Sequence, residues 1–348
     1  MKVSVLGAGA IGSMLGGLIK HHRPETDVVL IARGAHGQAM SDHGQVVLDG
    51  PWGRVASPLR VSFDVQDLAG SDYVLLTVKS QATEAAIVSA GPYLDDATLI
   101  SIQNGLNQNL LARHVPEEKT VIGVTATNMV VSAPGQVTLQ LDGVTILGPP
   151  RGADLAPHVR AAQALLQETG MRFEARGNIV AYQGNKLAIN AIGYAACLSQ
   201  SNLVSEALTD RAWRETVGLP LLEECLDTFH RAGISLLPIP KAPTAARIRW
   251  FSKRLNSPLM GPLLRWGVKR FYRKPIMFSL GQDLANRKTT EVDFINGEIV
   301  RMAEAHGGKA PCNAKIVELV HEMEARGDGV FFSQQEVVER IGPDGSSE

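Results

Sequence analysis

The sequence has few cysteines, no dominant charge and no long apolar run, and each shortage excludes a class of protein. Its three cysteines, Cys197, Cys225 and Cys312, are too few and too scattered for a disulfide framework or a CxxC metal site. Because 34 Lys and Arg balance 35 Asp and Glu, the whole chain attracts no polyanion. No apolar run approaches the roughly 20 residues of a membrane span. We therefore expect free thiols, a cytoplasmic location and no bound metal.

Length and pattern favour two globular domains. The 348 residues are 45% hydrophobic and 20% charged, an ordinary globular composition, and domains average roughly 150 residues. The first half alternates β-branched runs with helical stretches, which is typical of a parallel sheet covered on both faces. From about Asn178 the chain reads as helices, and its first residues read as a strand rather than a signal peptide. We predict an α/β domain over 1–176, an all-helical domain over 177–341 and a flexible tail at 342–348.

The individual elements follow from this periodicity. Strands are predicted at Lys2–Leu6, Asp27–Ala32, Asp72–Val78, Thr98–Ile102, Thr120–Thr125 and Arg172–Ala175. The Asp142-Gly143 pair between the alternating runs of Gln136–Leu147 predicts a β-hairpin. Helices are predicted at Ile11–His22, Ala82–Ala90, Leu106–His114, Ala153–Thr169, Ile179–Ser199, Glu215–Ala232, Thr290–His306 and Asn313–Ala325, with a short turn at Leu280–Ala285. Five prolines are expected to break up the stretch before Ser279.

A glycine-rich turn directly follows the first predicted strand. The spacing G-x-G-x-x-G is met by Gly7-Ala8-Gly9-Ala10-Ile11-Gly12, which opens a predicted helix and so has the context of a dinucleotide site. Gly7 suits the tight turn, Gly9 leaves room for a pyrophosphate, and Gly12 lets helix and strand pack closely. The unpaired amides at the helix start then face the phosphates. A turn that merely packs is the plainer interpretation, but the placement predicts that these six residues bind a cofactor.

The end of the second predicted strand bears on which nucleotide binds. NAD enzymes usually carry Asp or Glu there, for the ribose hydroxyls, whereas this strand ends in Ile31-Ala32-Arg33. A guanidinium suits a 2′-phosphate through charge-assisted hydrogen bonds. A plain surface arginine is the alternative. We therefore expect NADP (NADPH) rather than NAD as the cofactor, with Arg33 among its ligands.

Segments spread over nearly the whole chain carry a family resemblance. They are Gly7–Gly12, Arg33, Val78-Lys79-Ser80, Gln103-Asn104-Gly105, Asn185–Asn190, Ser279–Asp283, Thr290–Gly297, His306-Gly307 and Pro311-Cys312-Asn313. In this order they resemble the ketopantoate reductase (2-dehydropantoate 2-reductase) family, most specifically in K-L-x-x-N and T-E-x-D-x-x-N-G. The resemblance implies an α/β Rossmann-type N-terminal domain and an all-α C-terminal domain like that of 6-phosphogluconate dehydrogenase. It also implies NADPH-dependent reduction of a 2-oxo acid, with ketopantoate, a precursor in pantothenate biosynthesis, as the leading substrate.

Lys186 and Asn190 lie four residues apart in a predicted helix and so share one face. Reducing a ketone needs a hydride donor and a proton for the carbonyl oxygen. An ammonium can give that proton while an amide holds the substrate. The resemblance implies Lys186 as the general acid and Asn190 as a substrate ligand. Without it, a lysine at helical spacing is usually a solvated surface charge.

Four further polar residues match the family's site. The resemblance implies that Glu291 is catalytic, orienting the lysine or binding the nicotinamide ribose, and that Ser279 binds substrate. It places Lys79 and Asn104, each after a predicted strand, near the nicotinamide end of the cofactor, with Asn104 also in reach of the substrate. The plainer interpretations are a helix-start residue for Glu291, an N-cap for Ser279 and ordinary loop residues for the other two. Pairing with Glu291 would keep Lys186 charged and burial would lower its pKa; the sequence leaves open which effect prevails.

Two positions depart from the family pattern. Tyr194 stands eight residues beyond Lys186, where typical ketopantoate reductases carry a second substrate-facing Asn. A site that loses this amide discriminates between substrates differently, by about 1 kcal/mol or more. Ala82 stands three residues beyond Lys79 in place of the family's Gln, with Gln81 one position early. A bulkier 2-oxo acid, bound against Tyr194, therefore stays open as the substrate, and so does the strictness of NADP over NAD.

A basic segment is enlarged relative to the family. From Pro238 to Pro275 there is no acidic residue, and Trp250, Phe251, Trp266, Phe271 and Tyr272 interleave with ten bases: Lys241, Arg247, Arg249, Lys253, Arg254, Arg265, Lys269, Arg270, Arg273 and Lys274. The rest of the chain keeps 24 basic and 35 acidic residues, a formal charge of −11. We interpret the segment as a solvated basic helical hairpin packed on the acidic remainder. Contact with an anionic membrane surface and steering of an anionic ligand are the less favoured alternatives.

The function predicted from these residues is NADPH-dependent reduction of a 2-oxo acid. An alternative of another class is a non-catalytic NADP-binding protein, such as a membrane-associated sensor that uses the basic segment. The joint presence of Lys186, Asn190, Ser279 and Glu291 argues against it. We expect a small 2-oxo acid as the partner and no nucleic acid, because no recognised binding module accompanies the bases. The oligomeric state is not readable from one sequence, and a homodimer stays open.

Overall fold

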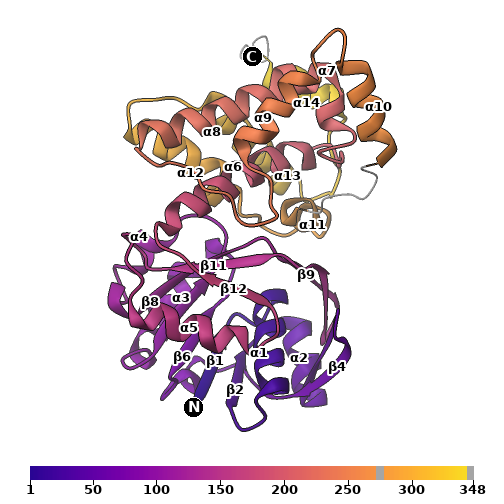
Figure 1. Cartoon of the computed structure of the whole chain (residues 1–348). Coiled ribbons are helices and arrows are strands. Elements are labelled where there is room, and N and C mark those ends of the chain that lie inside the picture. The colour runs from indigo at the N-terminus through magenta and orange to yellow at the C-terminus, as the bar shows by residue number, and fades with distance from the viewer. Residues whose placement is uncertain (272–277, 343–348) are drawn as a thin grey trace. The chain divides into compact units, whose positions relative to one another are not determined.

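The computed structural model describes residues 1–271 and 278–342, which separate into two compact units (Figure 1). Unit 1 comprises Met1–Gln183 and Ile239–Ala242, and unit 2 comprises Gly184–Pro238 and the described residues from Pro243 onward. Of the basic segment, Tyr272, Arg273 and Lys274 lie outside the described residues. So does the predicted tail, apart from its first residue.

A large sheet forms the centre of unit 1 (Figure 1). Its strands are β1 (Lys2–Leu6), β2 (Asp27–Ile31), β5 (Arg60–Ser62), β6 (Tyr73–Leu76), β7 (Thr98–Ile102), β8 (Thr120–Thr125), β11 (Val144–Gly148) and β12 (Arg172–Ala175). They follow the order β12-β11-β8-β7-β6-β1-β2-β5. Among these described strands only the pair β8–β11 is antiparallel, so β11 and β12 run opposite to the other six. The chain winds outward in both directions from β1 and β6. Doubly wound sheets bind ligands beyond the carboxyl ends of their strands, at this switch point.

A second sheet of four strands packs against the first helix. The strands are β3 (Gln45–Gly50), β4 (Gly53–Pro58), β9 (Asn128–Ala133) and β10 (Gln136–Leu141), in the order β4-β3-β10-β9. Helix α1 (Ala10–His22) contacts strands of both sheets. A Cβ on Gly16 would lie 2.5 Å from Leu30 of the large sheet, and one on Gly17 would lie 2.6 Å from Val46 of the small sheet. These two glycines therefore let α1 pack closely on both sides.

The predicted hairpin over Gln136–Leu147 is wrong, although both of its strands form. Strand β10 pairs with β9 and β3, whereas β11 joins the large sheet and pairs with β8. A type I′ turn requires positive φ at both central residues, and neither Asp142 nor Gly143 has one. A Cβ on Gly143 would lie 2.4 Å from the carbonyl carbon of Ala126. The glycine therefore serves a close approach of two backbones rather than a tight turn.

Helices cover both faces of the large sheet, as predicted. In β2, Val28 and Leu30 face one apolar core, which includes residues of α1, and Val29 and Ile31 face another. Strands buried on both faces read as continuous apolar runs, which is why the sequence reveals them. Ile239 of the returning segment joins the second core. The other helices of unit 1 are α2 (Gly34–His43), α3 (Thr83–Ala90), α4 (Gln108–Leu111) and α5 (Pro157–Gln167), with short turns η1 (Val65–Leu68), η2 (Ser80–Ala82), η3 (Gly91–Tyr93) and η4 (Glu117–Lys119).

Unit 2 is helical throughout its described residues. Its elements are α6 (Ile179–Cys197), which begins in unit 1, then η5 (Ala207–Thr209), α7 (Arg211–Trp213), η6 (Arg214–Gly218), α8 (Leu219–Arg231), α9 (Ala245–Arg254), α10 (Gly261–Phe271), α11 (Ser279–Ala285), α12 (Val292–Ala305), α13 (Pro311–Arg326) and α14 (Gln334–Ile341). The prolines of the basic segment do not prevent helices there. Pro243 precedes α9, Pro258 falls between α9 and α10, and Pro262 lies in the first turn of α10, positions where proline is tolerated.

Candidate active site

The glycine-rich turn joins β1 to α1 at the carboxyl end of a central strand. Gly7 has a φ of 102°, and a Cβ on it would lie 2.6 Å from the amide nitrogen of Val78, so glycine is required twice over. A Cβ on Gly12 would lie 2.4 Å from Oγ1 of Thr77. Around the corresponding position of Gly9, no heavy atom of the described residues lies within 4 Å. The turn is thus tightly packed at both ends and open in the middle.

The start of α1 presents amides that the fold leaves for a ligand. Gly7 and Ala8 donate their amides to the carbonyl oxygen of Ile31, at 3.2 and 3.1 Å. The helical ladder begins when Ser13 donates to the carbonyl oxygen of Gly9 at 2.9 Å. The amides of the first turn precede this ladder and have no acceptor within the helix. Together with the positive end of the helix dipole, they suit phosphate oxygens.

A cavity of about 950 Å³ opens beside this turn in unit 1. Gly7 and Gly9 line it together with Arg33, which follows β2, and Lys79, which follows β6. Gln81 and Ala82 line it as well, so a glutamine reaches the cavity from one position earlier than the family pattern. The structure therefore brings the predicted phosphate turn, the predicted 2′-phosphate ligand and the first-domain lysine to one cavity.

Asn104 is placed next to this cavity rather than in its lining. Its carbonyl oxygen accepts a hydrogen bond from Oγ of Ser80 at 2.8 Å and another from Asn107 at 2.9 Å. Gln103 donates to the carbonyl oxygen of Val78 at 2.7 Å. The loops that follow β6 and β7 are thus tied to each other. This bonding fixes the backbone that carries Lys79 and Asn104.

His36 lines the same cavity, although no motif of the sequence points to it. Its Nε2 lies 3.1 Å from Oγ of Ser13, and its Nδ1 accepts the amide of Gly135 at 2.9 Å. Burial lowers the pKa of the ring, which favours a neutral imidazole. The residue stands three positions after Arg33, in α2, a helix with few buried residues and no clear apolar periodicity. Its place in the cavity was therefore not visible from the pattern.

In unit 2, Lys186, Asn190 and Tyr194 recur at every fourth position of α6 and share one face. Lys186 and Asn190 are half-buried, and Tyr194 is 1% exposed. Burial lowers the pKa of Lys186 from 10.5 to about 8, while the charge of Glu291 acts in the opposite direction. Of the two effects that the sequence left open, burial is the larger.

Glu291 and Ser279 approach this face of α6 from later in the chain. Glu291 occupies the N-cap position of α12 and is 4% exposed, so the helix-start interpretation of this residue is confirmed. The tyrosine hydroxyl of Tyr194 lies 3.1 Å from Oγ of Ser279. Burial, and then the charge of Glu291, raise the pKa of Tyr194 well above its usual value. The interpretation of Ser279 as an N-cap is wrong, because Phe278 takes that position and Ser279 is the first residue of α11.

Other residues of the family motifs are structural. Asn296 and Asn313 are fully buried, and Asn296 donates to Oδ1 of Asn313 at 3.0 Å. Asn313 in turn donates its side-chain amide to Glu224 at 2.8 Å, and the backbone amides of Cys312 and Asn313 donate to the same carboxylate. Burial raises the pKa of Glu224. This network joins α8, α12 and α13, and so positions the start of the helix that Glu291 precedes.

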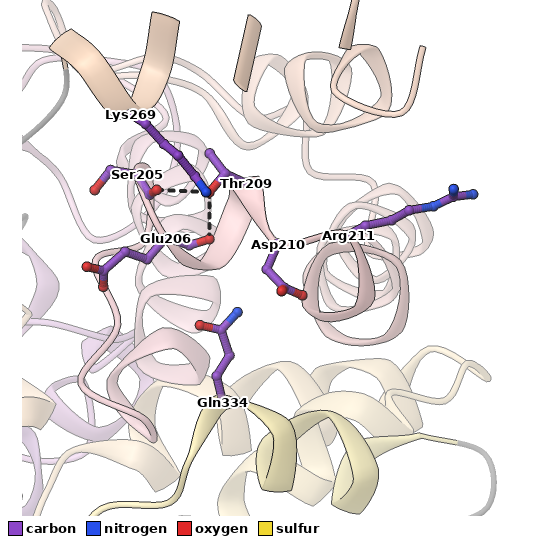
Figure 2. Close-up of a pocket in the computed structure, with 7 residues that line it drawn as sticks. All are labelled: Ser205, Glu206, Thr209, Asp210, Arg211, Lys269 and Gln334. Atoms are coloured by element: carbon purple, nitrogen blue, oxygen red, sulfur yellow. Dashed lines mark hydrogen bonds between the residues drawn. The ribbon is translucent and has the colours of Figure 1, made fainter. Parts of the chain in front are cut away.

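A second cavity in unit 2, of about 600 Å³, does not coincide with the predicted site residues. Figure 2 shows the polar side chains that line it: Ser205, Glu206, Thr209, Asp210, Arg211, Lys269 and Gln334. Thr209 donates its hydroxyl to the carbonyl oxygens of Ser205 and Glu206, at 2.8 and 3.0 Å. Among the described residues, no group of three or more His, Cys, Asp or Glu could hold a metal ion.

Two family models match most of the chain. Residues 3–152 match the family described as Ketopantoate reductase PanE/ApbA, and residues 178–324 match its C-terminal part. The chain belongs to the ketopantoate reductase family. This family consists of pyridine-nucleotide-dependent oxidoreductases that act on CH–OH groups. The resemblance proposed from the motifs is thereby confirmed, as are the Rossmann-type first domain and the helical second domain.

Named relatives agree with this assignment. The chain is 28% identical to 2-dehydropantoate 2-reductase of Pyrococcus horikoshii over 334 residues, which cover 94% of this chain and 99% of that protein. The PanE/ApbA family ketopantoate reductase of Ralstonia eutropha JMP134 is 25% identical, with a TM-score of 0.72 and coverage of 94% and 99%. A ternary structure of D-mandelate dehydrogenase with NADH and anilino(oxo)acetate is 23% identical, with a TM-score of 0.74 and coverage of 94% and 100%. This last likeness shows a shared fold alone.

Proposed function

We propose that this chain catalyses the NADPH-dependent reduction of a 2-oxo acid to a 2-hydroxy acid, with ketopantoate and pantoate as the leading pair. The observation that carries the proposal is the half-buried Lys186, whose pKa is lowered to about 8 beside the buried Glu291. A purely structural surface lysine would be solvated and would keep an ordinary pKa. The curated relatives named 2-dehydropantoate 2-reductase support the choice of substrate.

The residues of unit 1 fit a dinucleotide. Gly9 leaves open space, the first amides of α1 face an anion, and Arg33 and Lys79 bring two positive charges to the same cavity. In our proposal the six residues from Gly7 to Gly12 hold the pyrophosphate, and Arg33 holds a 2′-phosphate through paired hydrogen bonds. In the described part of the chain no carboxylate pairs with Arg33, so its charge stays available. We therefore propose NADPH over NADH, with Lys79 and Asn104 toward the nicotinamide end.

The chemistry divides between the cofactor and the residues of α6 and α12. Reduced nicotinamide, when bound, supplies a hydride to the ketone carbon. Lys186 then gives a proton to the carbonyl oxygen, on which negative charge develops. With a pKa of about 8, the amine is mostly protonated at neutral pH yet is a stronger acid than a solvated lysine. Glu291 keeps this amine charged and oriented, and Asn190, one helical turn further on, binds the substrate.

Tyr194 separates the leading substrate from a bulkier one. Its ring is buried and its hydroxyl is hydrogen-bonded to Ser279. The two side chains therefore bind each other at the positions where the family pattern has an amide and a serine. A ring in place of an amide offers apolar contact, and its one hydroxyl is already hydrogen-bonded to Ser279. This observation favours, as the second candidate, the reduction of a 2-oxo acid with a larger apolar side chain.

A substrate screen tests the proposal. The purified chain is mixed with NADPH or NADH and with ketopantoate or a series of branched and aromatic 2-oxo acids, and loss of the reduced nicotinamide absorbance is followed. We expect turnover of at least one 2-oxo acid, faster with NADPH than with NADH. Turnover of several 2-oxo acids but not of ketopantoate would reject the leading substrate and keep the second candidate. Nucleotide binding without turnover of any of them would instead support the non-catalytic alternative.

A further inference from the structure

Helix α10 and the turn before it expose apolar side chains that a soluble helix would bury. Leu259 is 91% exposed, Leu263 70%, Trp266 62% and Phe271 72%. Of the α10 residues, all of which the structure describes, Gly261 and Val268 alone are buried. Within the helix, Leu263, Trp266 and Arg270 are spaced by three and four residues, which is the spacing of a single helical face. Leu259 is exposed in the turn that precedes them. We call Leu259, Leu263, Trp266, Arg270 and Phe271 the α10 face.

The opposite side of α10 shows how this helix is attached to unit 2. Val268 is buried there, and Figure 2 shows Lys269 reaching from α10 toward Ser205 and Thr209. Arg265 donates to the carbonyl oxygen of Leu255 at 2.5 Å. The helix therefore has a definite inner side, and the α10 face is the side that unit 2 leaves uncovered.

Positive charge surrounds the α10 face. No acidic residue occurs in the sequence between Asp227 and Asp283. Arg270 lies over the ring of Phe271 at 5.6 Å, and Trp266 meets the same ring edge-on at 6.4 Å. In the described part of the chain, no carboxylate pairs with Lys269 or Arg270. The exposed apolar residues thus share their surface with Arg270, which forms no ion pair among the described residues.

The neighbouring helix α9 is held differently. Arg249 and Lys253 both pair with Glu223 of α8, at 3.0 and 2.8 Å. Asn185 of α6 accepts the amide of Ala245 at 3.0 Å, at the start of α9. These bonds anchor the hairpin on unit 2 from one side. None of these bonds involves a residue of α10.

We propose that the α10 face docks this protein on the surface of an anionic lipid bilayer. Leucine, tryptophan and phenylalanine are the side chains that enter the headgroup region, and arginine extends its charge to lipid phosphates while its stem stays apolar. In the described residues no helix is long and apolar enough to cross a membrane, so the contact is peripheral. A second copy fits less well, because a two-fold contact would bring two faces that carry positive charge together.

Vesicle flotation with the full chain tests the proposal. Vesicles of phosphatidylcholine alone are compared with vesicles that also contain phosphatidylglycerol, at low and at high salt. We expect binding to the anionic vesicles that weakens at high salt, and little binding to the neutral ones. Arg270→Gln should weaken binding about fivefold. Leu263→Ala and Trp266→Ala should each weaken it roughly tenfold, because they remove apolar area that enters the bilayer.

Matched variants control for unspecific effects. Leu141→Ala removes an exposed leucine of unit 1 (58% exposed), and Lys309→Gln removes an exposed base of unit 2. Both should bind vesicles like the unaltered chain. All variants change exposed side chains, so they should keep the thermal midpoint and the NADPH-oxidising activity of the unaltered chain.

Insertion itself has a spectroscopic readout. In a Trp250→Phe variant, Trp266 becomes the one exposed tryptophan, since Trp213 is fully buried and Trp52 is partly buried. Brominated lipids should then quench its fluorescence when anionic vesicles are added. Absence of binding to anionic vesicles at low salt would overturn the proposal. So would binding that Trp266→Ala leaves at full strength, or a dimer in solution that Trp266→Ala dissociates, which would assign the face to a second copy.

Discussion

Lys186 and Glu291 set the pH range in which the proposed reaction runs. The general acid must carry its proton, so kcat/KM should be constant below a pKa of about 8 and should fall as the pH rises above it. The charge of Glu291 raises this pKa. Glu291→Gln should therefore move the alkaline limb of the kcat/KM profile to lower pH. Glu304→Gln, an exposed carboxylate of the same helix, is the matched control and should leave the profile in place.

An unmoved or upward-shifted limb in Glu291→Gln would remove the electrostatic role of this carboxylate. A profile without any alkaline limb near pH 8 would remove Lys186 as the titrating acid. The two outcomes are separable, because the first concerns the position of the limb and the second its existence.

Tyr194 is the residue at which substrate choice should change. Tyr194→Asn restores the amide of the family pattern and removes a buried ring that is bonded to Ser279. We expect the ratio of kcat/KM for ketopantoate over a bulkier 2-oxo acid to rise about fivefold or more, since a lost or gained buried hydrogen bond is worth about 1 kcal/mol. Tyr194→Phe, which keeps the ring, should leave the ranking closer to that of the unaltered chain. An unchanged ratio in Tyr194→Asn would show that this position does not face the substrate.

Single residues also show which features of the site can be predicted from the sequence. The spacing of Lys186 and Asn190 predicts a shared helix face, and α6 has it, because helical geometry is local. The hydrogen bond between Tyr194 and Ser279 joins residues 85 positions apart, and the buried carboxylate of Glu224 meets Asn313 across 89 positions. Such pairs depend on how helices pack. One sequence holds no periodicity from which they follow.

At the scale of elements, the glycines of the β1–α1 turn have different roles: one leaves space for a ligand and another permits close packing. A Cβ on Gly9 meets no described atom within 4 Å, whereas one on Gly12 would lie 2.4 Å from Thr77. Gly9→Ala should change the free energy of unfolding by less than about 1 kcal/mol and weaken NADPH binding at least tenfold. Gly12→Ala should lower the free energy of unfolding by about 1–3 kcal/mol. Denaturant unfolding and NADPH fluorescence titrations measure the two quantities. Equal affinity of Gly9→Ala and the unaltered chain would place the pyrophosphate elsewhere.

The elements that were predicted differ physically from those that were missed. The central strands are continuous apolar runs because both of their faces are buried. Strand β4 consists mostly of exposed residues, and α2 buries only a few of its residues. Their sequences therefore lack the apolar pattern that distinguishes a strand or a helix from a loop. The hairpin predicted from the Asp142-Gly143 pair was wrong for another reason. A glycine at this position is compatible both with a tight turn and with a close approach of two backbones. The pairing of β10 and β11 with different strands shows that the second applies here.

At the scale of the whole molecule, charge is unevenly distributed. Outside the segment from Pro238 to Pro275 the chain carries −11, and inside it ten bases stand without an acid. Two of these bases, Arg249 and Lys253 of α9, form ion pairs with Glu223. In α10, Arg270 forms no ion pair among the described residues and lies over the exposed ring of Phe271. A basic composition was thus readable from the sequence, while its division into an anchored helix and an uncovered one required the structure.

The family assignment depends on the whole chain, whereas the proposed reaction depends on a few residues. Identity to the Pyrococcus horikoshii relative is 28% over 94% of the chain, enough for the fold to persist while a position such as 194 differs from the family pattern.

The measurement that tests the central claim most directly is the turnover and NADPH affinity of Lys186→Ala. We predict that kcat falls by about 10²–10⁴, the scale of general acid catalysis, while the NADPH dissociation constant stays nearly unchanged. Unaltered turnover in this variant would contradict the account.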